Sequence, residues 1–242
     1  GPACADENVF LTFTSTVGSG LFEVSIKELA GGSFIYGGSG KGEPIWTFTP
    51  GALAPGTHTF TLQAIRDANG CVTSGLNQTT TITVYPVPDL SAFNTGTANP
   101  VDDPIYVCEG DIVNVNSGAD KATVDVSFDL NASVTLQPNW QLRYRVRNLG
   151  LGTEINDPNS LAAGVISSIA DANGQTYFIN PGDPLTLTVE DNLMIGNDDN
   201  LVEPVEVVYE IFPRLYVDGS PACDGASITV RALILPTPRV DR

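Results

Sequence analysis

The sequence predicts an all-β protein composed of two tandem β-sandwich modules. Residues 57–62 and 185–189 alternate threonine with larger residues, which is the two-residue period of a strand with one buried face. The chain contains 24 Gly and 17 Pro, a composition typical of many short strands joined by turns. Its 242 residues are enough for two domains with separate cores. Only residues 159–170 favour a short helix, because they contain little turn signal.

An internal repeat sets the domain boundary. Residues 71–88 and 223–238 each consist of a cysteine, a polar turn, an alternating strand and a Pro-x-Pro sequence. Proline cannot donate to a β ladder, so Pro-x-Pro ends a strand and stiffens the linker that follows. The repeat predicts a first module at residues 3–86 and a larger second module at 87–238. We interpret residues 1–2, Gly-Pro, as a remnant of tag removal and the chain as an excised fragment.

The four cysteines are Cys4, Cys71, Cys108 and Cys223, and they allow three pairings. Cys4 and Cys108 each precede acidic residues and a strand, whereas Cys71 and Cys223 each precede the last strand of a module. The simplest arrangement closes each module with its own bridge, which predicts Cys4–Cys71 and Cys108–Cys223. An even cysteine count in an acidic β-rich chain indicates an oxidising compartment.

Composition and charge exclude several classes of partner. Hydrophobic residues make up 42% of the chain and charged residues 16%, which indicates a globular protein. The net charge of −17 argues against nucleic acid and anionic membrane surfaces as partners. No apolar run approaches the roughly 20 residues that a membrane-spanning helix needs. Of the 28 acidic residues, 22 follow Pro86, so a cation is expected in the second module.

Catalytic motifs are weak, and the sequence predicts that the protein is not an enzyme. His58 is the single histidine, lies mid-strand among threonines, and would have to serve any Ser-His-Asp or Cys-His arrangement. Residues 37–42 contain glycines and a lysine but lack the Ser/Thr and the helix of a phosphate-binding loop. The acidic residues offer many carboxylate pairs for glycoside hydrolysis, and none stands out.

Two local patterns resemble repeat modules of Bacteroidetes surface proteins. Residues 53–64 (Leu-Ala-Pro-Gly-Thr-His-Thr-Phe-Thr-Leu-Gln-Ala) and 67–71 (Asp-Ala-Asn-Gly-Cys) resemble the end of an SprB-type gliding-adhesin repeat, with His58 at a usual tyrosine position. Residues 191–193, 204–213 and 222–230 together resemble the PKD-like module of the same proteins. The resemblance implies immunoglobulin-like sandwiches, type IX secretion and a place in a long surface filament. It implies no catalytic residues.

Calcium is the one cofactor for which the sequence offers candidate ligands, and the pattern requires no cofactor. Asn197, Asp198, Asp199 and Asn200 follow closely after Asp191, and short oxygen-bearing side chains suit a hard cation with six to eight oxygen ligands. The alternative is that Asn and Asp are ordinary turn residues. The Asp-x-Asn-Gly sequences at 67–70 and 171–174 are interpreted as turns in which glycine has a positive φ.

Arg143, Arg145 and Arg147 alternate with apolar residues and therefore share one strand face. Such a face can bind an anionic polysaccharide, or it can form a cross-strand ladder with Glu206 and Glu210, which the pattern favours. Tryptophans are also candidates for stacking on sugars, although a sandwich commonly buries tryptophan in its core. The tryptophans are Trp46 and Trp140.

Together these observations predict structural and adhesive modules of a cell-surface protein, outside the cell and associated with the outer membrane, that serve gliding and surface attachment. The expected partners are neighbouring modules of the same chain and surface polysaccharide, without nucleic acid or membrane insertion. The alternative is a carbohydrate-binding or accessory module of a secreted hydrolase.

Overall fold

The computed structural model describes residues 3–9, 11–14, 21–26, 34–39, 44–48, 52–93, 104–108, 112–115, 119–149, 165–169, 174–196 and 204–236. These residues form strands, turns and bends without a helix. Among them, no helix is long and apolar enough to cross a membrane. The chain divides into two units, residues 1–87 and 88–242, a division that differs by one residue from the predicted boundary.

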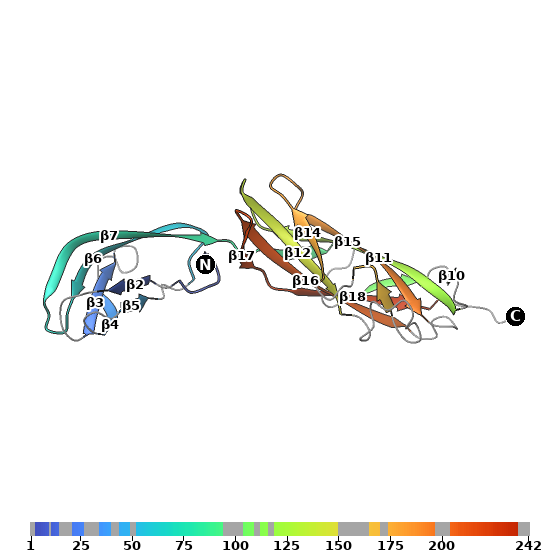
Figure 1. Ribbon diagram of the computed structural model, residues 1–242, viewed down its shortest axis with the longest axis horizontal. Helices are drawn as coiled ribbons and strands as arrows, with labels where there is room; N and C mark the ends of the chain where they lie inside the picture. Colours follow the sequence, from blue (N-terminus) through green and yellow to red (C-terminus); the bar gives the residue numbers. More distant parts are fainter. Residues whose placement is uncertain are drawn as a thin grey trace. The chain divides into compact units, whose positions relative to one another are not determined.

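The first unit contains seven strands in the described part of the chain, shown in blue to cyan in Figure 1. They are β1 (Ala3–Cys4), β2 (Leu11–Thr14), β3 (Leu21–Ile26), β4 (Phe34–Ser39), β5 (Pro44–Phe48), β6 (Gly56–Arg66) and β7 (Val72–Tyr85). One sheet has the order β1-β7-β6-β3-β4, and β2 pairs with β5 in a second sheet. Leu11 from β2 packs with Val24, Ile26, Phe60 and Leu62 of the larger sheet, so the two sheets share a core.

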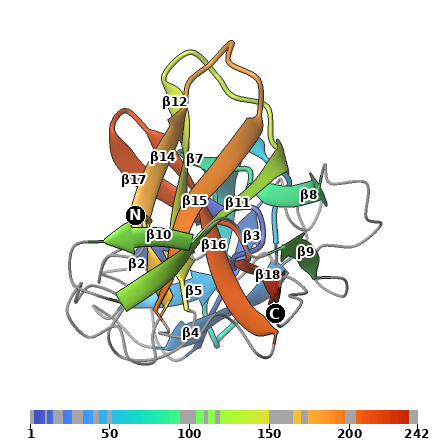
Figure 2. The same ribbon diagram turned by 90° about the vertical axis from the view of Figure 1, so that its right-hand side faces the viewer.

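The second unit contains eleven described strands. They are β8 (Asp89–Phe93), β9 (Ile105–Cys108), β10 (Ile112–Val115), β11 (Ala119–Ser133), β12 (Trp140–Asn148), β13 (Val165–Ser167), β14 (Gln175–Ile179), β15 (Thr186–Gly196), β16 (Val205–Val217), β17 (Ser220–Asp224) and β18 (Ile228–Leu235). One sheet has the order β10-β11-β15-β13 with β8 beside β11. The other has the order β14-β12-β16-β18-β9 with β17 beside β16. Figure 2 shows β11 and β15 side by side.

The core of the second unit lies between these two sheets. Phe128 and Leu130 of β11 and Val189 of β15 are buried in the same cluster as Tyr144 of β12 and Tyr209 of β16. The rings of Phe128 and Tyr209 meet edge to face with their centroids 5.4 Å apart. Two largely antiparallel sheets packed over one apolar core form a β-sandwich, the layer arrangement of immunoglobulin-like domains. The predicted fold class is therefore confirmed.

In each unit an early strand that ends in a cysteine pairs in parallel with the last strand. In the first unit β1 runs parallel to β7, and Cys4 lies opposite Tyr85. In the second unit β9 runs parallel to β18, and Cys108 lies opposite Leu235. Both partner residues immediately precede a Pro-x-Pro sequence. The repeat that was visible in the sequence thus corresponds to one strand pairing that occurs in both units.

Two details of the turns agree with the predicted chemistry. Asp67 accepts hydrogen bonds through Oδ1 from the backbone N–H of Asn69 and of Cys71, at 3.0 and 2.9 Å. Gly70 completes this turn with a φ of 81°, which favours glycine. Gly174 also has a positive φ, 79°, whereas residues 171–173 lie outside the described residues.

The predicted disulfide pairing is wrong in this structure. Cys4 and Cys223 are disulfide-bonded, whereas Cys71 and Cys108 are free and exposed. Cys4 lies at the end of β7, beside Tyr85, whereas Cys71 precedes the first residue of that strand. The two positions are roughly 40 Å apart along the strand, far beyond the roughly 7 Å between Cα atoms that a disulfide can bridge.

A similar distance excludes the second predicted bridge, Cys108–Cys223. Cys223 lies opposite Leu215 of β16. Cys108 lies opposite Leu235 of β18, next to the pair formed by Ile234 and Val205 at the other end of β16. Ten residue steps of an extended strand span roughly 33 Å. The predicted short helix at 159–170 is also wrong where it is described, because Val165–Ser167 forms β13 and pairs with β15.

A buried carboxylate connects the two sheets of the second unit. Asp191 on β15 is 2% exposed. Its Oδ2 accepts hydrogen bonds from Tyr209 Oη at 2.8 Å and from Asn148 Nδ2 at 3.3 Å. Its Oδ1 accepts bonds from the backbone N–H and the Oγ of Ser168, at 2.8 and 3.0 Å. Burial and the adjacent carboxylate raise the pKa of Tyr209, which keeps its hydroxyl protonated as a donor.

Tyr209→Phe tests this network, with Tyr144→Phe as its matched control. Both hydroxyls are buried, but the Tyr144 hydroxyl has no hydrogen-bond partner among the described residues. Tyr209→Phe is expected to lower the free energy of unfolding by about 1–3 kcal/mol, because a buried carboxylate loses a donor. Tyr144→Phe is expected to change it by less than about 0.5 kcal/mol or to increase it. Calorimetric unfolding of the full chain measures both, and equal losses would contradict the assignment.

Candidate functional site

The candidate site is the outward face of β12 in the second unit. Leu142, Tyr144 and Val146 point into the core and are 0% exposed. Arg143, Arg145 and Arg147 occupy the alternate positions, and Arg145 is exposed while the other two are half-buried. The predicted sharing of one strand face is therefore confirmed. The apolar residues fix the orientation of the strand, and that orientation directs all three guanidinium groups away from the core.

The neighbouring strands place aromatic and charged side chains beside each arginine. Arg143 lies opposite Phe178 of β14 and Arg214 of β16. Arg145 lies opposite Thr176 and Phe212 on the same two strands. Residues directly opposite each other in a sheet have side chains on the same face, so these groups form one surface.

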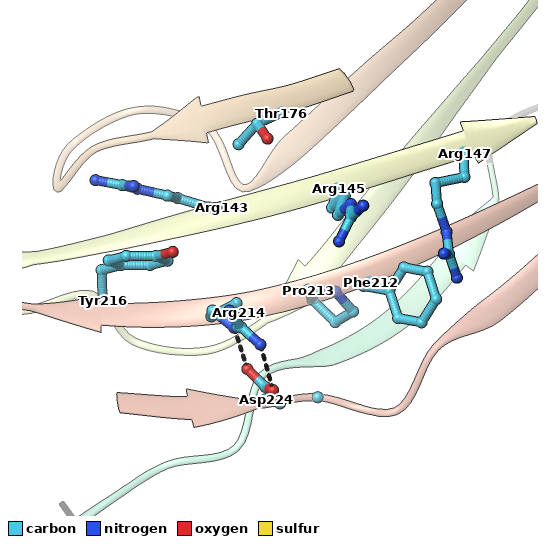
Figure 3. Close-up of a pocket in the computed structure, with 10 residues that line it drawn as sticks. Arg143, Arg145, Arg147, Thr176, Phe212, Pro213, Arg214, Tyr216 and Asp224 are labelled. Atoms are coloured by element: carbon cyan, nitrogen blue, oxygen red, sulfur yellow. Dashed lines mark hydrogen bonds and ion pairs between the residues drawn. The ribbon is translucent and has the colours of Figure 1, made fainter. Parts of the chain in front are cut away.

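Two arginines of this surface are paired with carboxylates. Arg147 Nη2 donates to Glu210 Oε2 at 2.5 Å, and the Arg147 guanidinium lies 4.7 Å from the centre of the Phe212 ring. Arg214 donates through both Nε and Nη2 to the carboxylate of Asp224 on β17 (Figure 3). The hydrogen bonds to Asp224 raise the pKa of Arg214. Each of these carboxylates neutralises one positive charge.

Arg143 is held by aromatic rings instead. Its guanidinium lies 3.7 Å from the centre of the Tyr216 ring and 4.7 Å from that of Phe178. Its Nε donates to Oε1 of Gln141 at 2.6 Å. Figure 3 shows the side chain extended above the Tyr216 ring. Stacking of this kind orients the planar guanidinium. No carboxylate in the described part of the chain pairs with it, so its remaining N–H groups can bind an anion.

Arg145 differs from the other three. Among the described residues, its guanidinium makes no hydrogen bond or ion pair, although it lies between Arg143 and Arg147 on β12. Thr176 and Phe212 lie on either side of it across the sheet. A guanidinium group has five N–H donors in a planar array that matches a carboxylate or phosphate. The N–H donors of Arg145, unpaired among the described residues, therefore lie beside the ring-stacked Arg143.

These side chains line a cavity of about 370 Å³. Its lining combines arginines, aromatic rings and one acidic side chain. The lining residues are Arg143, Arg145, Arg147, Thr176, Phe212, Pro213, Arg214, Tyr216, Asp224 and Gly225. A concave surface with apolar walls and a few convergent polar groups is the usual form of a binding site.

Gly174 is required at the edge of this cavity. Its φ of 79° is a left-handed conformation, and a Cβ atom built there would lie 2.6 Å from Cγ of Arg147 and 2.8 Å from the carbonyl oxygen of Val146. The same atom would lie 3.2 Å from Nε of Arg145. Only glycine allows this approach, because any larger residue would displace backbone as well as the two arginines.

The predicted ladder with glutamates is present in part. Glu210 pairs with Arg147, as expected. Glu206 instead pairs with Arg231 of β18, so it does not reach the β12 arginines. Arg214, Phe178 and Tyr216 were not identified from the sequence. Residues 212, 214 and 216 alternate along β16, which indicates that they share one outward face. Only the register between β12 and β16 shows that this face adjoins the arginines of β12.

The predicted calcium ligands lie mostly outside the described residues. Asn197, Asp198, Asp199 and Asn200 cannot be placed, and Asp191 is buried with both carboxylate oxygens accepting hydrogen bonds. Within the described ranges, no group of three or more His, Cys, Asp or Glu side chains is placed to hold a metal ion. Calcium binding therefore stays a prediction.

The other candidate residues occupy structural positions. His58 lies on β6 and its Nε2 is 2.8 Å from the carbonyl oxygen of Ala54. Trp140 is half-buried at the start of β12, opposite Val217, whereas Tyr144 and Tyr209 are fully buried in the described core of the second unit. Trp46 lies on β5 opposite Phe13 in the backbone register.

Comparisons with known proteins identify no family for this chain. No protein-family model matches the sequence, and no curated protein matches it. Among solved structures, the FN1–FN3 domains of chicken CNTN1 match with a TM-score of 0.31 and 9% identity, covering 96% of this chain and 65% of that chain. The CFA/I adhesin CfaE of enterotoxigenic E. coli has a TM-score of 0.30 and 12% identity, covering 97% and 79%.

The CupB6 tip adhesin from Pseudomonas aeruginosa has a TM-score of 0.25 and 11% identity, covering 91% of this chain and 80% of that chain. This chain spans less than two thirds of the length of the CNTN1 chain. Likenesses at these scores identify neither a family nor a function, so the function is argued from the site itself.

Gly174→Ala tests the close approach at the cavity, and Gly70→Ala is its matched control. Both glycines have a φ near 80°, but nothing lies within 4 Å of a Cβ atom built at Gly70. Gly70→Ala is expected to lower the free energy of unfolding by about 1–2 kcal/mol, the cost of a left-handed non-glycine residue. Gly174→Ala is expected to cost at least about 1 kcal/mol more, because of overpacking. Urea unfolding of both variants makes the comparison, and equal costs would contradict the crowding.

Proposed function

We propose that this chain is a non-catalytic adhesive and spacing segment of a cell-surface protein, and that its arginine–aromatic surface binds carboxylated polysaccharide. The arginine–aromatic surface consists of Arg143, Arg145, Arg214, Phe178 and Tyr216 on β12, β14 and β16. The observation that carries the proposal is the exposed guanidinium of Arg145, which is unpaired among the described residues and lies beside the ring-stacked Arg143.

The charge distribution supports an anionic ligand. The chain has a net charge of −17, so an isolated cluster of guanidinium groups is unusual on its surface. Carboxylates within the protein neutralise Arg147 and Arg214 but leave Arg143 and Arg145 uncompensated in the described structure. A polymer with a carboxylate on each sugar ring supplies the missing anions, and its rings can contact the exposed edge of Phe178.

The affinity of one such site is expected to be low. Binding at an exposed arginine competes with water and salt, so a single sugar residue gains little free energy. Attachment to a polymer nevertheless becomes strong when many modules in a filament bind at once, because each further binding event is intramolecular. A shallow, weakly binding surface is therefore compatible with adhesion.

The location and the biological process are further parts of the proposal. The disulfide bonding of Cys4 and Cys223 supports an oxidising, extracellular environment. The sequence resemblance to SprB-type adhesins supports export by the type IX route and a role in gliding on surfaces. Binding of calcium by residues 197–200 belongs to the same proposal and is tested by the effect of a chelator on the unfolding temperature.

A carbohydrate-binding module of a secreted hydrolase is the second candidate. Trp140 is half-buried at the start of β12 instead of fully buried in the core, so the residue is partly accessible to solvent. Saturable binding of a neutral oligosaccharide on a glycan array, lost in Trp140→Ala, would favour this candidate. Binding of acidic glycans alone, unaffected by Trp140→Ala, would favour the adhesive function.

Arg145→Gln tests the proposed site, and Arg231→Gln is its matched control. Both substitutions remove one positive charge from the same sheet, but Arg231 is paired with Glu206 on a different pair of strands. Arg145→Gln is expected to weaken binding to polygalacturonate about tenfold, since a hydrogen bond between charged groups contributes roughly 1.5–3 kcal/mol. Arg231→Gln is expected to have a much smaller effect.

The measurement is retention of the full chain on immobilised polygalacturonate at low and at physiological salt, with neutral dextran as the reference polymer. Binding of the unmodified chain should weaken as the salt concentration rises, because the interaction is between charges. Equal losses in the two variants would show that only net charge matters. Equal retention on dextran would show that the site does not recognise carboxylates.

A further inference from the structure

We propose that Asp224 is an autoinhibitory residue of the arginine–aromatic surface: its carboxylate occupies the guanidinium of Arg214 and so weakens the binding of carboxylated polysaccharide. Among the described residues, the cavity is lined by four arginines and one acidic side chain, which is Asp224. The inference rests on the polysaccharide-binding function proposed above. It adds that the protein itself limits the strength of that binding.

The strand register places Asp224 beside Arg214. Asp224 on β17 lies directly opposite Arg214 on β16, so the two side chains share one face of the sheet. Arg214 donates through Nε and Nη2 to both oxygens of the carboxylate (Figure 3). A ligand carboxylate that binds a guanidinium in a bidentate manner uses the same kind of parallel N–H pair. Asp224 therefore occupies donors that a polysaccharide carboxylate would otherwise bind.

The backbone on either side holds Asp224 at the wall of the cavity. Cys223, which precedes it, is paired with β16. The N–H of Gly225, which follows it, donates to the carbonyl oxygen of Pro213 at 2.9 Å. A Cβ atom built at Gly225 would overlap with the carbonyl oxygen of Pro88 and would lie 2.7 Å from Cγ of Pro213, so the segment is tightly packed. The Asp224 carboxylate consequently stays at the cavity when its ion pair opens.

The ion pair is weak enough for a ligand to replace it. The side chains of Arg214 and Asp224 are 46% and 61% exposed. Exposed ion pairs contribute little free energy, because water solvates both partners and salt screens their attraction. Glu210, the partner of Arg147, is only 21% exposed, and it is not among the residues that line the cavity. Asp224 is therefore the carboxylate with which a ligand exchanges.

Loss of the Asp224 charge would enlarge the group of arginines without a carboxylate partner. Arg214 lies directly opposite Arg143, which is stacked on the ring of Tyr216. Arg145 lies two residues further along β12 and has no ion pair among the described residues. Three such guanidinium groups on two adjacent strands would then face the ligand instead of two. The negative charge of Asp224 also repels nearby carboxylates of the polymer, so Asp224 weakens binding both by competition and by repulsion.

A site that is weakened in this way suits attachment that must remain reversible. One module releases its ligand readily, because its affinity is low. A polymer bound by many modules nevertheless stays attached, since each released module rebinds intramolecularly.

Asp224→Asn tests the proposal, and Glu206→Gln is its matched control. Each substitution removes one negative charge and releases one arginine, but the arginine that Glu206 releases is Arg231, which is not among the residues that line the cavity. Asp224→Asn is expected to bind polygalacturonate about fivefold more tightly at low salt, the amount by which an exposed ion pair can compete. Glu206→Gln is expected to change the affinity less than about twofold. Titration of the full chain with polygalacturonate measures both, and the gain should shrink as the salt concentration rises.

A second substitution in the Asp224→Asn background identifies the group that is released. Arg214→Gln in this background is expected to return the affinity to near that of the unmodified chain, because the gain comes from the freed guanidinium. The unfolding temperature of each variant is measured as a control, and it should change little because the ion pair is exposed.

The outcomes separate this inference from the proposed function. Equal gains in Asp224→Asn and Glu206→Gln, or a gain that survives Arg214→Gln, would overturn the autoinhibition. Binding by the unmodified chain without a gain in Asp224→Asn would also overturn it and would leave the polysaccharide-binding function standing. Binding by Asp224→Asn alone would support the autoinhibition but contradict the proposed function of the unmodified chain. Absence of binding in every variant would overturn both proposals.

Discussion

The antiparallel pairing of β12 with β16 is the constraint on which both the core and the candidate site depend. Leu142 and Tyr144 on β12 and Ile211 and Leu215 on β16 are each 0% exposed. A shift of one residue would exchange the two faces of a strand, which would bury guanidinium groups and expose this apolar set. The cost of burying charge therefore fixes the register, and the register in turn assembles the arginines with the aromatic residues of the adjacent strands.

The arginine surface shows how a protein can retain positive charge within an acidic domain. Pairing with Glu210 and Asp224 neutralises the charges of Arg147 and Arg214, and stacking against Tyr216 and Phe178 orients Arg143. Stacking differs from ion pairing in this respect, because the π face of a ring orients a cation and contributes no full negative charge. The surface therefore combines fixed geometry with charge that remains available to a ligand.

Much of the fold was predictable because its determinants are local. Alternating threonine and apolar residues predicted β6 and β15, and the Asp-Ala-Asn-Gly sequence predicted the turn before Cys71, in which Asp67 accepts two backbone hydrogen bonds. The common face of Arg143, Arg145 and Arg147 also followed from the period of a strand. By contrast, Arg214 and Phe178 lie 71 and 35 positions after Arg143, and no local pattern connects them.

The sequence by itself determined the all-β class and the side of β12 on which the arginines lie, since side-chain alternation acts over a few residues. Only the tertiary structure decided which partners those arginines have and which cysteines are oxidised. Cysteines that appear complementary along the sequence, such as Cys4 and Cys71, lie at opposite ends of one long strand. Disulfide bonds depend on distance in space, which is set by strand pairing and not by the order of residues.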